Sequence, residues 1–285
     1  MENYLTLLKK CLTTGVTKTD RTGVGSKFLS GETLEWDMSN GFPIITTRKT
    51  TLRIAFEETM FFLRGETDTK ILEAKNINIW KGNTSRKFLD DSYLAHLPEG
   101  SIGTGYSHQW RNFGGDIDIP NGIDQVKNML RNIEANPFDR RHVITAWNPL
   151  QLGETPLPPC HLMHMYSVDP DKNALNSCFI MRSNDIPFGL PFNIMGYALL
   201  NHLFAKHLGY NPGKLVYFGW DAHIYLNQID MCNEQLTREP RPLPDLIIHK
   251  DISTFDELLK LEYTDVELVG YLPHPDIKNK PKMAI

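Results

Sequence analysis

The run NIMGYALLNHLFAKHLG, residues 193–209, constrains the fold more than any other stretch of this sequence. It is the longest segment with helical character, and it is apolar on almost every side. A helix with no polar face has to be covered by other elements rather than lie on the surface. No apolar run in the chain reaches the length of a membrane span. A chain of 285 residues is long enough to bury such a helix, so we expect it at the centre of the fold.

The remaining segments predict one α+β domain spanning residues 1–285. The sequence shows no internal repeat, low-complexity tract or linker that would divide it. Apolar residues at helical spacing predict three further helices, one of which should end at Gly65. Alternating or β-branched runs predict strands in a mixed or antiparallel sheet. The expected helices are 2–14, 52–64 and 122–135; the expected strands are 142–147, 161–168, 175–183, 214–220 and 246–249, with a hairpin at 26–38.

Charge and cysteine usage indicate the class of protein. A formal net charge of −4 argues against general affinity for nucleic-acid backbones, but not against a small anion held by a few local arginines. The four cysteines are scattered and form no CxxC pair, which is typical of a reducing compartment. The N-terminal segment has lysines inside an amphipathic helix and does not resemble a signal peptide. We therefore expect a cytoplasmic protein.

The stretch PPCHLMHMY, residues 158–166, leaves three interpretations of Cys160 open. A zinc site is disfavoured, because Cys160, His161 and His164 do not match a usual ligand spacing. A buried, inert cysteine is the common case for this residue type. A nucleophile requires a lowered thiol pKa, which a nearby arginine can supply, and Arg182 lies on the strand expected to pair with this one.

Other motifs combine charged and polar residues without a decisive pattern of their own. Glu57 and Glu58 stand inside an apolar helix, either on a solvated face or buried with raised proton affinity. DRTGVG (20–25) has glycines but lacks the Lys-Ser/Thr that completes a P-loop. MRSND (181–185) is typical of an anion or ligand site after a strand. DAHIY (221–225) places Asp221, His223 and Tyr225 on one side of an extended segment.

Taken in order, these segments resemble the thymidylate synthase family over nearly the whole chain. The matching motifs are DRTGVGS, GFPIITTRK, YSHQWRNFGG, DRRHVITAWNP, LPPCH, RSND, GLPFNI, DAHIYLN, REPRPLP, GYLPHPDIK and the terminal MAI. The resemblance implies an α+β fold with a sheet-mediated homodimer. It implies dUMP as substrate and 5,10-methylenetetrahydrofolate as co-substrate, with dTMP and dihydrofolate as products. It implies no metal.

The resemblance also implies roles for individual residues. Cys160 would add to C6 of the uracil ring, with Glu58 and Tyr106 moving protons around it. Asn193 would hold the uracil edge. The residues implied to bind dUMP are Arg21, Arg182, Ser183, Asp185, Asn193, His223 and Tyr225, with Arg140 and Arg141 reaching over from a second subunit. The residues implied to bind the folate are Arg48, Ile79, Trp80, Leu157, Asp185, Phe192 and Ile285.

Several positions depart from the family pattern and bring in a second hypothesis. The polar residues among them could hold a water near the reacting carbon, as in the pyrimidine hydroxymethylases of the same superfamily. Such an enzyme would convert dUMP to 5-hydroxymethyl-dUMP and leave tetrahydrofolate; if phage-encoded, it would work in the host cytoplasm. A non-catalytic nucleotide-binding homologue is the third hypothesis. The departing residues are Thr59, Phe61, Lys81, Ser107, His108, Met181 and Trp220.

Overall fold

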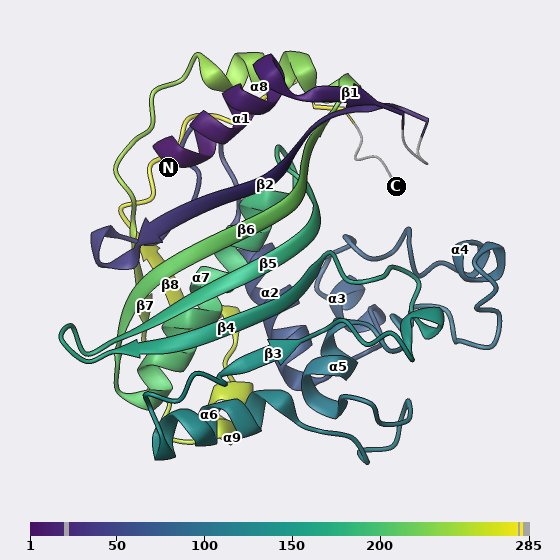
Figure 1. Ribbon diagram of the computed structural model, residues 1–285, viewed down its shortest axis with the longest axis vertical. Helices are drawn as coiled ribbons and strands as arrows, with labels where there is room; N and C mark the ends of the chain where they lie inside the picture. The colour runs from purple at the N-terminus through teal and green to yellow at the C-terminus, as the bar shows by residue number, and fades with distance from the viewer. Residues whose placement is uncertain (20–22, 279, 282–285) are drawn as a thin grey trace.

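A mixed β-sheet forms one layer of the protein. The computed structural model describes residues 1–19, 23–278 and 280–281. Within them, six strands form the main sheet (Figure 1). Strands β5 and β6 are parallel and the other neighbours are antiparallel, which confirms the predicted mixed sheet. In spatial order the strands are β1 (Val16–Lys18), β2 (Ser26–Asp37), β6 (Asn211–Tyr225), β5 (Ala174–Asp185), β4 (His161–Asp169) and β3 (Val143–Thr145).

The apolar run that opens the sequence analysis is the central helix α7 (Gly189–Leu208). It connects β5 to β6 and lies between the sheet and α2 (Leu52–Arg64). Ile194, Ala198 and Leu203 are fully buried, as expected for a helix without a polar face. The helix begins four residues before the predicted start because Pro191 stands in its first turn, where a missing N–H costs nothing. The prediction of a central helix is confirmed.

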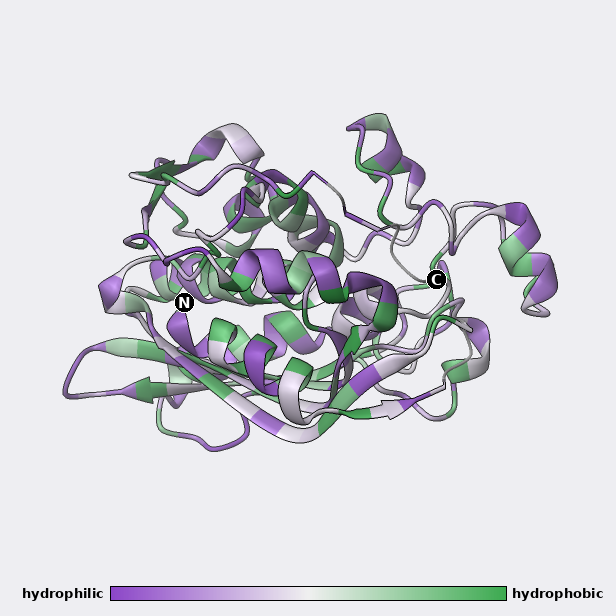
Figure 2. Cartoon of the chain, turned by 90° about the horizontal axis from the view of Figure 1, so that it is seen from above, coloured by the Kyte–Doolittle hydropathy of each residue, from purple (hydrophilic) through white to green (hydrophobic). Residues whose placement is uncertain are grey.

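The other helices surround this core. Figure 2 shows the sheet as the lower layer with helices stacked above it. Helix α2 ends as predicted at Gly65, whose φ of 75° is left-handed. Strands β7 (Asp245–Ile248) and β8 (Val266–Val269) form a separate two-stranded sheet. The remaining helices are α1 (Glu2–Thr14), α3 (Lys70–Ala74), α4 (Arg86–Asp91), α5 (Tyr106–Asn112), α6 (Gln125–Ala135), α8 (Ile229–Leu236) and α9 (Phe255–Leu259).

The hairpin predicted for residues 26–38 is wrong. These residues form the single strand β2, which pairs antiparallel with β6 from Ser26 opposite Tyr225 to Asp37 opposite Lys214. The polar residues that suggested a turn lie in mid-strand, where Gly31 has a φ of 75°. The long partner strand keeps the segment extended, so that the local turn signal is overridden by non-local pairing.

The second face of the sheet carries apolar side chains that no described residue of the chain fully covers. Phe218 and Trp220 on β6 are 41% and 68% exposed. Met165, Cys178 and Val216 on the same sheet are only partly buried. An exposed apolar surface of this kind usually marks a site of interaction with another molecule. In the described part of the chain, no helix combines the length and hydropathy needed to cross a membrane.

Candidate active site

Cys160 lies directly before β4 and beside Arg182 of β5. The antiparallel pairing of the two strands brings them together, and the Arg182 amide donates to the Cys160 carbonyl at 2.9 Å. The guanidinium donates through Nε to the Pro159 carbonyl at 2.8 Å and through Nη2 to the Pro158 carbonyl at 2.7 Å. These bonds hold Nη2 at 3.8 Å from the Cys160 sulfur. A fixed cation this close favours the thiolate form.

Tyr106, the first residue of α5, contacts the same cysteine from the other side. Its hydroxyl accepts a hydrogen bond from the Cys160 amide at 2.7 Å. Its ring stacks on His161 with centroids 4.1 Å apart. Burial raises the pKa of Tyr106 well above its usual value, so the hydroxyl keeps its proton at neutral pH. The structure thus brings Cys160, Arg182 and Tyr106 together.

The two adjacent glutamates of α2 have different environments. Glu57 is 5% exposed and forms an ion pair with Lys75 at 2.7 Å. Glu58 accepts a hydrogen bond from Trp80 Nε1 at 2.9 Å and lines a small, partly open cavity. Burial raises the pKa of Glu58 to about 7, partly offset by the Trp80 bond. A carboxyl group with a pKa near neutrality is suited to both giving and taking a proton.

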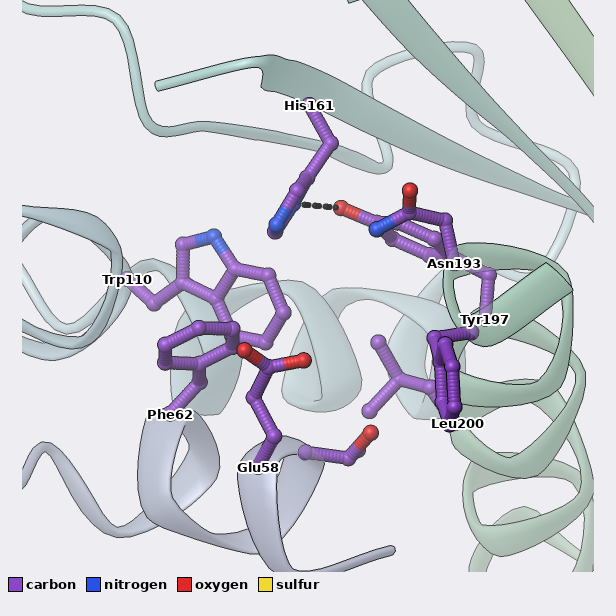
Figure 3. A pocket seen from close by; sticks show the side chains of 10 residues that line it. Glu58, Phe62, Trp110, His161, Asn193, Tyr197 and Leu200 are labelled. Carbon is purple, nitrogen blue, oxygen red and sulfur yellow. Dashed lines mark hydrogen bonds between the residues drawn. The ribbon is translucent and has the colours of Figure 1, made fainter. Parts of the chain in front are cut away.

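The cavity lies between α2, β4 and α7 (Figure 3). Asn193 reaches it from the second turn of α7, and its Oδ1 accepts from Asn184 Nδ2 at 3.2 Å. His161 Nδ1 lies 2.7 Å from the Tyr197 hydroxyl. Burial lowers the pKa of His161 to about 3, so this ring is neutral at physiological pH. The lining residues are Glu58, Thr59, Phe62, Trp110, His161, Phe192, Asn193, Gly196, Tyr197 and Leu200.

His223 and Tyr225 lie at the end of β6, next to the end of β5. His223 Nδ1 is 3.0 Å from Asp221 Oδ1, and the His223 and Tyr225 rings meet edge to face at 5.1 Å. Lys18 of β1 forms an ion pair with Asp221. Parallel pairing sets Ser183 opposite Asp221 and brings the MRSND and DAHIY motifs to one edge of the sheet. The sequence analysis did not consider Lys18.

The residues assigned to the folate occupy varied positions. Ile79 is 44% exposed, and Trp80, Leu157 and Phe192 are partly buried. Asp185 accepts from Gln228 Nε2 at 3.0 Å and from the Phe188 amide at 3.1 Å. Burial raises the pKa of Asp185. Arg48 is only 2% exposed, and its guanidinium donates to the Pro187 carbonyl at 2.5 Å.

Of the assigned residues within the described part of the chain, Glu58, Phe192 and Asn193 line the cavity itself, and the others lie outside its lining. Arg140 and Arg141 are exposed at the start of β3, where Arg141 Nε donates to Asp139 at 2.9 Å. Arg21 and Ile285 fall outside the described residues.

The residues that depart from the family pattern separate into distinct locations. Thr59 lines the cavity beside Glu58. Met181 is buried in the core and Trp220 lies on the open face of the sheet. Lys81 forms an ion pair with Glu73 at 3.1 Å. Ser107 is buried, and His108 Nε2 lies 3.0 Å from the Gly115 carbonyl.

The sequence analysis also missed several residues of the lining. Tyr197 and Leu200 follow Asn193 at intervals of four and three residues, so helical spacing from an assigned residue could have found them. His161 was considered only as a metal ligand. Its contacts with Tyr106 and Tyr197 depend on tertiary packing that one strand pattern does not encode.

Comparison with known proteins identifies the family. The chain matches the thymidylate synthase family over residues 2–284. It is 42% identical over 282 residues to a bifunctional dihydrofolate reductase-thymidylate synthase of Leishmania major, covering 96% of this chain and 54% of that one. It is 42% identical over 283 residues to thymidylate synthase 1/2 of Encephalitozoon cuniculi, covering 96% and 95%. It is 38% identical over 291 residues to a thymidylate synthase of Agaricus bisporus, covering 98% of each. The chain thus spans about half the length of the bifunctional relatives, and it belongs to the thymidylate synthase family.

Proposed function

We propose that this protein transfers the one-carbon unit of 5,10-methylenetetrahydrofolate to C5 of dUMP, giving dTMP and dihydrofolate. The observation that carries the proposal is the group of Cys160, Arg182 and Tyr106 joined by short contacts, with Glu58 nearby on α2. The folate supplies the methylene carbon and the hydride that reduces it. The proposed catalytic domain spans residues 1–285, and its place of action is the cytoplasm.

Each residue of the group has a chemical part in the proposal. The Cys160 thiolate adds to C6 of the uracil, which makes C5 nucleophilic. Arg182 favours the thiolate and contributes to binding the phosphate. Tyr106 takes part in removing the proton from C5. Glu58 relays protons at the uracil, and the Asn193 amide offers both a donor and an acceptor to its edge.

The proposed dUMP site extends to the end of the sheet and to a second copy of the chain. Arg21, Arg182 and Ser183 bind the phosphate, Asp185 lies beside the base, and His223 and Tyr225 hold the deoxyribose hydroxyl. The open apolar face of the sheet supports a homodimer. The exposure of Arg140 and Arg141, away from Cys160 of their own chain, supports their contribution to the site of the other subunit.

The proposed folate site uses four apolar side chains that are exposed or only partly buried. Ile79, Trp80, Leu157 and Phe192 contact the ring system, and Asp185 makes a polar contact to it. Arg48 belongs to the basic environment of the glutamate tail. The C-terminal Ile285 closes over both ligands and excludes water.

A dUMP hydroxymethylase is the second candidate, and one observation favours it. Thr59 places a hydroxyl group on the lining of the cavity beside Glu58. A water held there is a reactant for hydration of a methylene group. A nucleotide-binding homologue without turnover is the third candidate.

One assay distinguishes the three. The protein is incubated with dUMP and 5,10-methylenetetrahydrofolate, dihydrofolate is followed by absorbance, and the nucleotide is weighed by mass spectrometry. We expect a product in which a methyl group replaces the hydrogen at C5, heavier by one CH2 unit, and an equal amount of dihydrofolate. A hydroxymethyl product without dihydrofolate would establish the second candidate, and bound but unchanged dUMP the third. The matched control is Cys160→Ser, which should bind dUMP but turn over none of it.

A further inference from the structure

The hydroxyl group of Thr59 has an unusual environment for a threonine inside a helix. Such hydroxyls commonly donate to the carbonyl one turn earlier. Thr6, Thr13 and Thr14 of α1 do so, at 3.0, 2.9 and 2.8 Å. Among the described residues, the hydroxyl of Thr59 makes no such bond and has no other hydrogen-bond partner, although the residue is only 6% exposed. Its hydroxyl lies instead on the lining of the cavity that Glu58 also lines.

Gly196 provides the space that this hydroxyl faces. A glycine inside a helix costs about 1 kcal/mol relative to alanine, so its presence in α7 calls for a local reason. A Cβ at this position would lie 3.2 Å from Thr59 Oγ1, closer than ordinary van der Waals contact. The absence of that carbon leaves room beside the hydroxyl. Gly196 and Thr59 therefore shape the cavity together, from opposite helices.

The size and the polarity of the cavity both fit one water molecule. About 20 Å³ is open to the centre of a water-sized sphere, where one water needs roughly 10–15 Å³. The Thr59 hydroxyl and the Glu58 carboxyl group thus share one small space, and buried polar groups in this state are normally satisfied by water.

We propose that Thr59 and Glu58 hold one ordered water in the space left by Gly196, and that Thr59 is a positioning residue for the Glu58 carboxyl group. The hydroxyl of Thr59 donates to the water, and the water donates to a carboxylate oxygen. A chain of this kind stabilises the ionised carboxylate, because each bond polarises the next. Any effect of this water on turnover through Glu58 rests on the proposed function; the presence of the water and its effect on the pKa of Glu58 do not.

The side chains that face Glu58 are uncharged at neutral pH, so a water bonded to Glu58 should influence whether its carboxyl group is ionised. Trp80 donates to the carboxylate, and Tyr106 of α5 and Tyr197 of α7 are uncharged at neutral pH because burial raises the pKa of both. His161 of β4 is neutral, since burial lowers its pKa to about 3. Loss of the water should therefore raise the pKa of Glu58 above its value of about 7.

The test uses the ligand-free protein and needs no turnover. High-resolution crystal structures are compared for the native protein, Thr59→Val, Thr59→Ser and Gly196→Ala. The pKa of Glu58 is measured in each by infrared titration of its carboxyl band, assigned with Glu58→Gln. Thr13→Val, which removes a back-bonded hydroxyl on α1, is the matched control.

We expect a water within hydrogen-bonding distance of Thr59 and Glu58 in the native protein and in Thr59→Ser. Thr59→Val and Gly196→Ala should lose it. Thr59→Val should raise the pKa of Glu58 by about 0.5–1 unit, which corresponds to one hydrogen bond. An empty native cavity, a water retained in Thr59→Val, or an unchanged pKa in that variant would each overturn the proposal. Failure of the dUMP assay alone would overturn the proposed function and leave this one standing.

Discussion

The hydroxyl of Tyr106 accepts a hydrogen bond from the backbone amide of Cys160 at 2.7 Å. The group proposed to remove the C5 proton is therefore tied to the residue proposed to bond to C6. Movement of one is transmitted to the other through a single contact. The stacking of Tyr106 on His161, and the bond from His161 to Tyr197, extend this link from α5 to α7.

Tyr106→Phe tests the link directly. The variant removes a proton-transfer group and leaves the Cys160 amide without this acceptor. We expect kcat to fall by roughly 10²-fold or more, and stability to fall by about 1 kcal/mol, with little change in dUMP affinity. Steady-state kinetics and urea unfolding measure the two effects. Tyr166→Phe, which removes a buried hydroxyl bonded to His164 at 3.0 Å, should affect stability and spare kcat.

Arg182 should control the reactivity of the Cys160 thiol. Arg182→Met removes the cation 3.8 Å from the sulfur, and alkylation of Cys160 by iodoacetamide should slow by roughly tenfold. Arg182→Lys keeps the charge but cannot reproduce the two bonds to the proline carbonyls, so an intermediate rate is expected. Peptide mass spectrometry follows Cys160 separately from the other cysteines. Equal rates in all three proteins would contradict this role.

Glu58 should make the protein less stable as the pH rises. Its folded pKa of about 7 lies above the unfolded value of 4.5, so the folded state binds the extra proton between these values. The favourable contribution is full below pH 4.5 and is lost as the pH rises through 7, amounting to about 2–3 kcal/mol. Glu58→Gln should flatten this part of the stability profile. Urea unfolding at pH 5 and pH 8 gives the comparison, and parallel profiles for both proteins would argue against the raised pKa.

The ion pair of Glu57 and Lys75 should stabilise the packing of α2 against the end of α3. Lys75 follows α3, and its carbonyl also accepts from Arg53 of α2 at 2.8 Å. Lys75→Met leaves Glu57 buried without its cation and should cost about 1–3 kcal/mol of stability. Glu57→Gln combined with Lys75→Met should recover part of that loss. A double-mutant cycle measured by urea unfolding gives the coupling, and simple additivity would show that the pair contributes nothing.

The open face of the sheet should be the surface that joins two subunits. Phe218→Asp introduces a charge at its centre and should shift the protein toward monomer in sedimentation velocity. Activity should fall with it, because the proposed phosphate site would lose the arginines of the second subunit. Ile247→Asp is the matched control, since Ile247 on β7 is also 41% exposed. A dimer that survives the change at Phe218 would place the interface elsewhere.

Local signals predicted the parts of the fold that depend on neighbouring residues. Helix α1 begins and ends where its apolar spacing indicated, and α2 ends at Gly65 because a left-handed residue closes the last turn. The pairing of β4 with β5 followed from two alternating runs around a short turn. That pairing also predicted the contact of Arg182 with Cys160.

Long-range pairing explains what the sequence did not predict. Strand β2 pairs with a strand nearly two hundred positions later, so its polar middle resembled a turn. Strand β3 is shorter and β6 longer than their apolar runs indicated. The cavity requires the relative placement of α2, β4 and α7, and the partnership of Thr59 with Gly196 exists only after those elements pack.

The continuous unit formed by β5, α7 and β6 has a consequence for how the site opens. It contains Arg182, Asn193 and His223, whereas Glu58 and Tyr106 come from an earlier part of the chain. The site is therefore a seam between two segments of the chain, and amide hydrogen exchange in α2 and α5 requires transient opening of the structure there. A ligand that spans the seam binds only the closed arrangement and so slows amide hydrogen exchange on both sides. Binding of a ligand at the site would then be measurable as slower amide hydrogen exchange in α2 and α5.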